Sequence, residues 1–227
     1  SLFLLTEKGN GVYSADNLGL NIHRQYRLRI KTAGQAEYLS GFMQPRITPA
    51  IDTINWERNN TGMDIFINTH DPDNNTRYYQ WAYQETWEFH SAYFSKIKYR
   101  YHPVTGHPYN VDVRSEEEML KMYYCWQTGY SSQILIASSA GLVRDSIHFP
   151  VQFIPRDSWK LSVLYSINIS QYAISAAEYN FLSTMKKNTE QMGSLFDAQP
   201  SELNGNIRCL SIPSETVIGY VGIASIQ

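Results

Sequence analysis

The segment RYYQWAYQETWEFHSAYF, residues 77–94, constrains the fold more than any other part of the chain, because it places eight aromatic rings in eighteen residues. Side chains of a β-strand alternate between two faces. On that geometry one face carries nearly all the rings: Tyr79, Trp81, Tyr83, Glu85, Trp87, Phe89 and Tyr93. The other face is mainly polar: Gln80, Ala82, Gln84, Thr86, Glu88, His90 and Ala92. The pattern predicts a strand whose aromatic face is buried in the core of a β-sandwich.

Two residues of the aromatic face do not fit a uniform core. Glu85 predicts either a bulge midway along the strand or a position at the rim of the sheet. Tyr93 lies beyond the polar Ser91, and we expect its ring to reach the surface. Each of the other rings removes roughly 150–250 Å² from water when buried, which is too much apolar surface to leave exposed in a row. We therefore expect these inner rings to form core and not a platform for a sugar.

The composition indicates a β-rich globular protein and excludes several functions. Hydrophobic residues make up 43% of the 227 residues and charged residues 18%, as in chains that bury a core. The 17 tyrosines favour β-structure. A net charge of −2 gives no electrostatic basis for binding nucleic acid. No apolar stretch approaches the ~20 residues of a membrane span, and the first residues do not have the form of a signal peptide.

Turn residues divide the chain into two parts. The stiff sequence PRITP, residues 45–49, predicts a boundary between a small β module at 1–44 and a main β domain at 45–227. The few strands expected at 1–44 cannot form a stable core alone, so we expect the first strands of that module to be absent from this sequence or supplied elsewhere. Short apolar or alternating runs predict further strands at 51–57, 63–68, 123–126, 133–138, 147–154, 159–170, 206–211 and 217–225.

Two helices are expected in the main domain. An S-x-x-E capping box at 115–118 predicts the start of a short helix. Apolar residues recur at three- and four-residue steps from Ile174 to Met185, which predicts a helix at about 172–191 that packs on the sheet and ends at Gly193. The predicted fold class is mainly β: an antiparallel β-sandwich or barrel-like domain with one substantial C-terminal α-helix.

No pattern in the sequence predicts a catalytic residue, a metal site or a cofactor. Glu85 and Glu88 cannot form a glycosidase pair, because a three-residue step in a strand places them on opposite faces. His102 and His107 share one loop but lack a third metal ligand. The sequence from Asp71 lacks the glycine and the glutamate that a calcium-binding loop requires. We therefore expect a protein that is not an enzyme and needs no cofactor.

The loop YHPVTGHPYN, residues 101–110, is the predicted contact region for a ligand or partner. Two prolines and a glycine interrupt any strand there, and binding residues concentrate on loops held by a rigid scaffold. The candidate contact residues are Tyr101, His102, His107, Tyr109 and, outside the loop, Tyr93. The expected ligand is a glycan or a peptide, and the alternative for the loop is a plain hairpin connection.

The two cysteines, Cys125 and Cys209, leave two alternatives open. They are far apart in the sequence and do not form a CxxC pair, which excludes zinc and thioredoxin motifs. Their residue types and spacing allow one disulfide or two buried thiols equally well.

The last third of the chain resembles a known family. The stretch ISAAEYNFLSTMKKNTEQMGSLFDAQPSELNGNIRC, residues 174–209, is followed by ETVIGYVGIASI, residues 215–226. Together they resemble the closing signature of Bacteroidetes outer-membrane lipoproteins catalogued as domain of unknown function 4249. Residues 11–40 are similar to the second half of that family's N-terminal module, which is immunoglobulin-like or carboxypeptidase-regulatory-like. The aromatic strand and residues 125–139 are similar too, so the resemblance covers nearly the whole chain.

The resemblance implies a location and a partner. It implies a protein of the outer membrane, facing outward, that meets the membrane only through a lipid anchor absent from this sequence. It also implies association with a TonB-dependent transporter. The expected function is the non-enzymatic ectodomain of such a lipoprotein, an accessory or ligand-capture partner of the transporter. The alternative is a free-standing carbohydrate-binding or adhesive β-module. The extracytoplasmic location favours a disulfide between Cys125 and Cys209.

Overall fold

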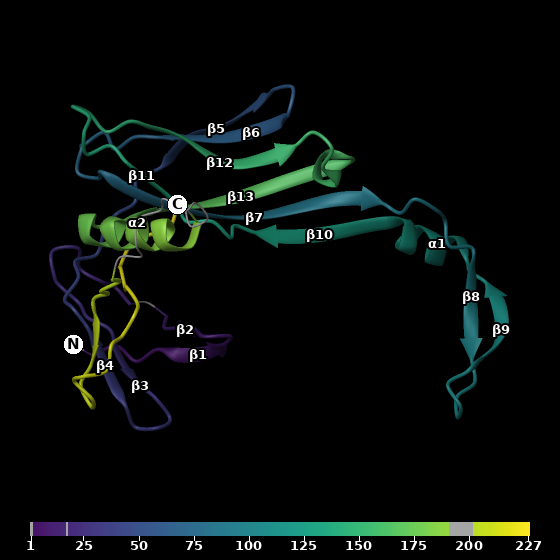
Figure 1. Ribbon diagram of the computed structural model, residues 1–227, viewed down its shortest axis with the longest axis horizontal. Coiled ribbons are helices and arrows are strands. Elements are labelled where there is room, and N and C mark those ends of the chain that lie inside the picture. The colour runs from purple at the N-terminus through teal and green to yellow at the C-terminus, as the bar shows by residue number, and fades with distance from the viewer. Residues whose placement is uncertain (1, 17, 191–201) are drawn as a thin grey trace, which may run out of the picture.

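The aromatic strand organises the upper part of the molecule. In a computed structural model of the protein, which describes residues 2–16, 18–190 and 202–227, this strand is β7 (Tyr78–His90), the centre of the larger sheet (Figure 1). Its neighbours are all antiparallel: β13 (Leu164–Ala173) along one edge, β11 (Leu135–Ser138) and β10 (Tyr124–Tyr130) along the other. The second sheet has the order β12–β6–β5 and consists of β5 (Ile51–Arg58), β6 (Gly62–Thr69) and β12 (Ile147–Pro155).

The core between these two sheets contains the inner rings of β7. Tyr79 is fully buried, and Trp81 is 2% exposed and stacks on Phe149 of β12, with 4.8 Å between ring centroids. The Trp81 Nε1–H donates to Gln171 Oε1 over 2.8 Å, so the indole keeps a polar partner inside the core. Buried aliphatic side chains from both sheets fill the rest: Ile65, Ile67, Leu135, Ile147, Val151, Ile154 and Ile169. The predicted sandwich is confirmed. The predicted burial of the inner rings is confirmed for Tyr79, Trp81 and Trp87, whereas Tyr83 and Phe89 are half-buried.

A long helix covers part of the outer face of the larger sheet. α2 (Ala176–Glu190) follows Ser175, whose Oγ accepts a hydrogen bond from the Glu178 N–H over 3.0 Å. Leu182 is buried and packs with Ile136 of β11. The predicted substantial helix, and its packing on the sheet, are therefore confirmed.

The structure differs from the predicted helix in its start and in its buried anchor. Residues 172–173 belong to β13, because they continue its ladder with β7. Gly193, where the helix was expected to end, lies outside the described residues. Phe181 is half-buried against Tyr220, with 5.5 Å between ring centroids, so Leu182 is the buried anchor of the helix.

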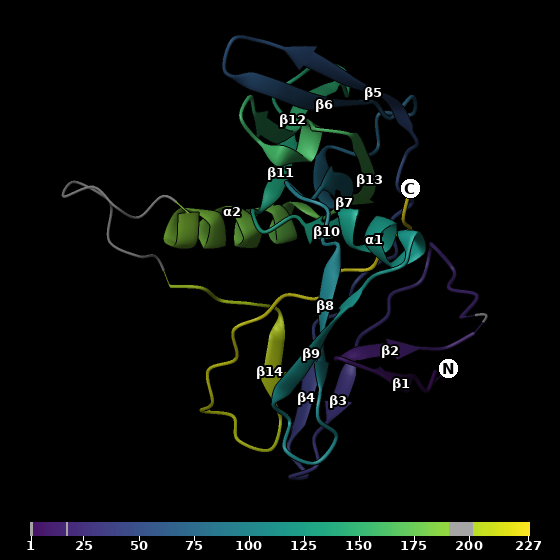
Figure 2. The same ribbon diagram turned by 90° about the vertical axis from the view of Figure 1, so that its right-hand side faces the viewer.

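A small sheet below the sandwich joins the two ends of the sequence. β1 (Thr6–Gly9) and β2 (Val12–Ser14) form a hairpin. The small sheet consists of β3 (Arg29–Lys31), β4 (Glu37–Ser40) and β14 (Ile207–Cys209) (Figure 2). β4 is its central strand, in the order β14–β4–β3. The module predicted at 1–44 is thus completed by a strand that the predicted boundary assigned to the main domain. Its immunoglobulin-like character stays a prediction.

The prediction of a last strand at 217–225 is wrong. Within this range the described structure has one isolated bridge, between Ala224 and Arg46. The side chain of Asn206 explains the difference: its Oδ1 accepts from the Val221 N–H over 2.9 Å, and its Nδ2 donates to the Val221 carbonyl over 2.8 Å. A side-chain amide therefore takes the place that a neighbouring strand would occupy.

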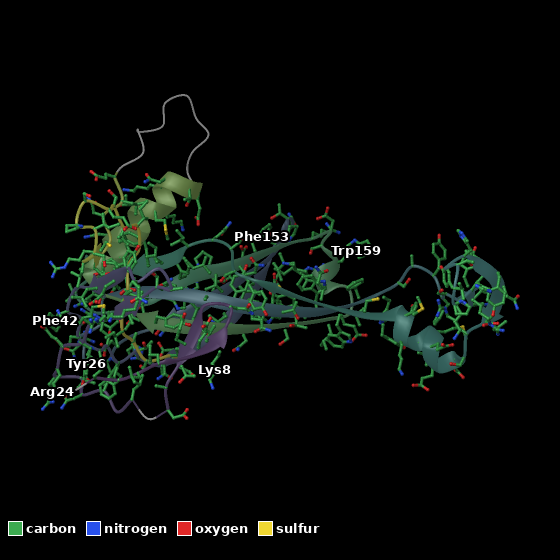
Figure 3. All side chains as sticks on the ribbon, turned by 90° about the horizontal axis from the view of Figure 1, so that it is seen from below. Lys8, Arg24, Tyr26, Phe42, Phe153 and Trp159 are labelled. Atoms are coloured by element: carbon green, nitrogen blue, oxygen red, sulfur yellow. The ribbon has the colours of Figure 1, made fainter. Side chains whose placement is uncertain are left out.

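Residues 91–123 form an arm at the far end of β7 and β10. The arm consists of β8 (Ile97–Tyr101), β9 (Pro108–Val113) and α1 (Glu116–Tyr123). Figure 1 shows the β8–β9 hairpin hanging at one end of the long axis, away from the sandwich and the small sheet. Figure 3, seen from below, places Arg24, Tyr26 and Phe42 of the small module at the opposite end. The predicted capping box is confirmed, because Ser115 and Glu118 bond to each other's backbone N–H.

The long loop predicted at 101–110 is wrong in its extent. Only residues 102–107 lie outside the two strands. Pro108 is the first residue of β9, where its missing N–H is compatible with a strand. The segment is therefore the turn of a hairpin, and β8 was not predicted.

Candidate interaction surface

The arm differs from the rest of the protein because none of residues 91–123 is buried. Its attachment to the sandwich is aromatic: Phe94 stacks on Tyr123 with 4.1 Å between centroids, and His90 lies 4.8 Å from Tyr123 and 4.9 Å from Tyr124. Beyond this joint the arm has no core of its own. A two-stranded hairpin is marginally stable at best in water, so its apolar side chains are available for another surface.

One side of the hairpin is apolar and exposed. Ile97 stands opposite Val113, and Tyr99 stands opposite Val111. These four and Tyr101, whose ring lies 6.5 Å from that of Tyr99, share one side by alternation. All five are exposed, from 47% for Val111 to 80% for Val113. We call this set, Ile97, Tyr99, Tyr101, Val111 and Val113, the hairpin face.

The other side of the hairpin carries charges that are already paired. The Arg100 guanidinium donates two hydrogen bonds to Asp112, of 2.9 and 2.6 Å, and these raise the pKa of Arg100. Lys98 bonds Glu118 of α1, which with the Ser115 N–H lowers the pKa of Glu118. These four charged side chains are thus occupied within the arm, while the hairpin face has no partner in the described structure.

The predicted contact residues lie at both ends of this hairpin. Tyr101, His102, His107 and Tyr109 come together at its turn, where the His102 N–H donates to the His107 carbonyl over 2.9 Å. The Nδ1 of His102 accepts from the N–H groups of Val104 and Thr105, both at 3.3 Å, so this ring nitrogen serves the turn. Tyr93, in the connection from β7, is 85% exposed, which confirms its predicted exposure.

Sequence reasoning missed most of the hairpin face. Four of its residues were not predicted as contacts: Ile97, Tyr99, Val111 and Val113. The signal was present as strict alternation of apolar and polar residues in IKYRY, 97–101, and in NVDV, 110–113. The prolines at 103 and 108 concealed it, because they favoured one long loop.

Glu85 is a buried carboxylate in the middle of the larger sheet, so both predictions for it, a bulge and a rim position, are wrong. The ladders of β7 continue through it without a shift, opposite Gly129 and Ile167. It is 3% exposed, and it fits because a Cβ on Gly129 would lie 3.1 Å from its Oε1. The missing side chain of Gly129 makes room for the carboxylate.

Three donors satisfy the Glu85 carboxylate. Lys160 Nζ lies 2.5 Å from Oε1, while the Tyr165 hydroxyl and Gln152 Nε2 donate to Oε2 over 2.9 and 3.2 Å. Lys160 comes from η1 (Trp159–Leu161), a short 3₁₀ helix that replaces the start of the strand predicted at 159–170. Burial, and then the bond to Glu85, raise the pKa of Tyr165 far above its ordinary value, so its hydroxyl stays a donor. The Glu85 carboxylate therefore has its hydrogen-bond partners within the protein and serves a structural role.

A second buried carboxylate, Asp145, is occupied in the same way. It is 4% exposed, and it accepts hydrogen bonds from the Tyr79 hydroxyl, the Ser139 hydroxyl and, over 2.6 Å, the Asp71 N–H. Burial and the bond to Asp145 raise the pKa of Tyr79. Among the described residues no group of three or more His, Cys, Asp or Glu side chains is arranged to hold a metal ion.

A cleft of mixed polar and apolar lining lies between the small module and the sandwich. It is lined by Arg46, Asp52, His70 and Asp71, among others. Asp52 Oδ2 lies 2.7 Å from His70 Nδ1, and this hydrogen bond raises the pKa of His70. The Asp71 carboxylate accepts from three backbone N–H groups of the turn that follows it, so it serves the turn.

The structure contradicts the predicted disulfide. Cys125 lies in β10, opposite Phe89 of the larger sheet, and Cys209 is buried in β14 of the small sheet. Both are free cysteines, because two separate sheets hold them. The sulfur of Cys209 accepts a hydrogen bond from the Ile212 N–H over 3.3 Å.

Comparison with known protein families gave a match over nearly the whole chain. The sequence model of a family described as "Domain of unknown function (DUF4249)" matches residues 2–227. No curated protein and no solved structure matches the chain. In the described part of the chain, every helix is too short or too polar to cross a membrane.

Proposed function

Because the chain belongs to the DUF4249 family, we propose that it is the non-enzymatic ectodomain of an outer-membrane lipoprotein on the cell surface, and that it serves a TonB-dependent transporter as an accessory or ligand-capture partner. The location and the class of partner rest on the resemblance of its closing signature to such lipoproteins. The structural observation that supports a partner-binding role is the hairpin face.

The hairpin face has the composition of the centre of a protein interface. Tyrosine is enriched at such centres, and charged residues are depleted there. On this arm the charged groups, such as Arg100 and Asp112, flank the apolar side and are paired with each other. A rim of that kind excludes water around an apolar contact without requiring new ion pairs. Docking would also supply the packing that a lone hairpin lacks.

The proposal is tested with the full-length lipidated protein in native membranes. The protein is cross-linked, purified, and its partners are identified by mass spectrometry. The test variant is Tyr99→Ser with Val111→Ser, which removes the central cross-strand pair of the hairpin face. The control is Trp56→Ser on β5, an equally exposed ring (67%) outside the arm.

We expect the wild type and the control to retain a TonB-dependent transporter. The hairpin variant should recover at least about tenfold less of it, because central interface residues carry most of the binding energy. Retention of the transporter by the hairpin variant, or its absence from the wild-type sample, would contradict the proposal.

A further inference from the structure

The outer face of the larger sheet is covered at one end and bare at the other. α2 packs on this face through the Tyr179 ring, which lies 5.2 Å from that of Tyr78 at the start of β7. Along β7, the even-numbered residues share the face of Tyr78. Farther from the helix, the same face continues over Gln84, Thr86 and Glu88, next to β10 and β13, as Figure 1 shows for these strands.

The strand register arranges this bare part as three rows of three side chains. Thr86 stands between Thr128 of β10 and Ser166 of β13, and the two threonine hydroxyls lie 3.1 Å apart, which confirms that they share a face. The row on one side is Trp126, Glu88 and Leu164; the row on the other is Tyr130, Gln84 and Asn168. We call these nine residues the outer grid.

Two large rings of the outer grid are open to solvent. Trp126 is 57% exposed and Tyr130 is 70% exposed. They lie on the same face of β10, four residues apart, which corresponds to about 13 Å along a strand. The small side chain of Thr128 separates them, so each ring is accessible to a different unit of an extended ligand.

The grid also offers unused hydrogen-bonding groups beside these rings. The side chains of Gln84, Ser166 and Asn168 make no hydrogen bond to any described residue. An amide both donates and accepts, as does a hydroxyl, and this suits a ligand that carries many hydroxyl groups. A mixture of exposed rings and free amides differs from the hairpin face, where apolar side chains stand together without polar neighbours.

The charge of the grid narrows the class of ligand. Glu88 is its one charged residue, and its Oε1 lies 3.1 Å from Nε2 of the neighbouring His90. The nine positions contain no lysine or arginine, so the grid has no cation to attract a phosphate, a sulfate or an acidic sugar. The surface is therefore complementary to an uncharged ligand with apolar ring faces and hydroxyl edges.

We propose that the outer grid is a binding platform for a neutral oligosaccharide that lies along β10. The C–H faces of its sugar rings contact Trp126 and Tyr130, and its hydroxyl groups exchange hydrogen bonds with Gln84, Glu88 and Asn168. The platform is independent of the transporter contact proposed for the arm. Its aromatic residues lie on the strand next to β7, on the face opposite to the buried rings.

The test measures binding of neutral hexasaccharides to the 227-residue chain by isothermal titration calorimetry. The probes are cellohexaose, xylohexaose, mannohexaose and maltohexaose, with hexagalacturonate as the acidic comparison. Trp126→Ala and Tyr130→Ala each remove one ring. Trp56→Ala is the matched control, because this ring is equally exposed but lies on β5.

We expect the wild type to bind at least one neutral hexasaccharide. Each ring variant should bind it about tenfold more weakly, since one ring contact of this kind contributes on the order of a factor of ten, and Trp56→Ala should bind like the wild type. Both rings are exposed, so the Tm of each variant should equal that of the wild type. Gln84→Ala, which leaves both rings in place, provides a second test and should also weaken binding.

Three outcomes would overturn the platform. One is failure of the wild type to bind any of the neutral probes. Another is unchanged affinity in both Trp126→Ala and Tyr130→Ala. The last is binding of hexagalacturonate alone. Loss of the transporter contact in the hairpin variant does not bear on any of them, so this proposal and the proposed function fail separately.

Discussion

The ion pair of Glu85 and Lys160 should cost more stability when Lys160 is replaced than when Glu85 is replaced. Both single changes, Lys160→Met and Glu85→Gln, remove the charge pair, but they leave different groups behind. After Lys160→Met, the carboxylate of Glu85 stays in a position that is 3% exposed. After Glu85→Gln, the ammonium of Lys160, whose side chain is 26% exposed, can turn into water on its flexible stem.

The magnitudes follow from these surroundings. Breaking a buried pair and leaving a buried charge costs about 3–5 kcal/mol. Tyr165 and Gln152 still donate to Glu85 when Lys160 is changed, so we expect about 2–3 kcal/mol for Lys160→Met. Glu85→Gln should cost about 1–2 kcal/mol, because it strands no charge. The double variant should be more stable than Lys160→Met alone.

The assay is urea unfolding followed by circular dichroism, with the free energy of unfolding obtained by linear extrapolation. Thermal melting provides a second measure, in which each kcal/mol corresponds to roughly 2–4 °C of Tm for a chain of this size. Equal costs for the two single variants, or a loss below about 0.5 kcal/mol for Lys160→Met, would refute the argument that the carboxylate is trapped and the ammonium is not.

Three further predictions follow from burial. Trp81→Ala should lower the free energy of unfolding by about 3–5 kcal/mol, whereas Tyr93→Ala should change it little, since that ring is 85% exposed; equal melting temperatures would contradict this. Cys125 and Cys209 should both react with a maleimide in the unreduced, denatured protein. A count of zero thiols would instead support the disulfide between them. Burial raises the pKa of Glu178, so the stability contributed by its protonated form is lost as pH rises through that pKa. Glu178→Gln should therefore be more stable than the wild type at pH 7 and should lose this advantage below pH ~4, as measured by urea unfolding across pH.

The elements predicted well are those whose signal is local and repeated. The alternation from Tyr79 to Phe89 predicted β7 and its buried face, because eleven residues of one period leave little ambiguity. The capping box at 115–118 and the apolar stripe of α2 were also read correctly, since a helix start and a helix face depend on neighbouring residues.

The features that were missed depend on distant residues. Glu85 looked like an irregularity because its partners, among them Lys160 and Tyr165, are about eighty positions away. A strand was predicted at 206–211, where β14 lies, but its place in the small sheet was not, because no neighbouring residue shows that it pairs with the distant β4. On the candidate surface, Tyr101 was predicted as a contact because it lies at the start of the expected loop. Tyr99 was not predicted as a contact, because the hairpin that exposes it was not predicted.

The junction of β4 with β14 has a consequence for the order in which the protein folds. The Glu37 N–H bonds Ser211 Oγ across 174 residues, and the Tyr38 hydroxyl bonds Glu215 across 177. During synthesis, residues 37–40 are made before the strands of the sandwich, whereas their partner strand β14 is made after them. Contacts between such distant positions are slow to form, because closing a long loop is entropically costly. We therefore expect β14 to join β4 after the sandwich encoded between them has folded.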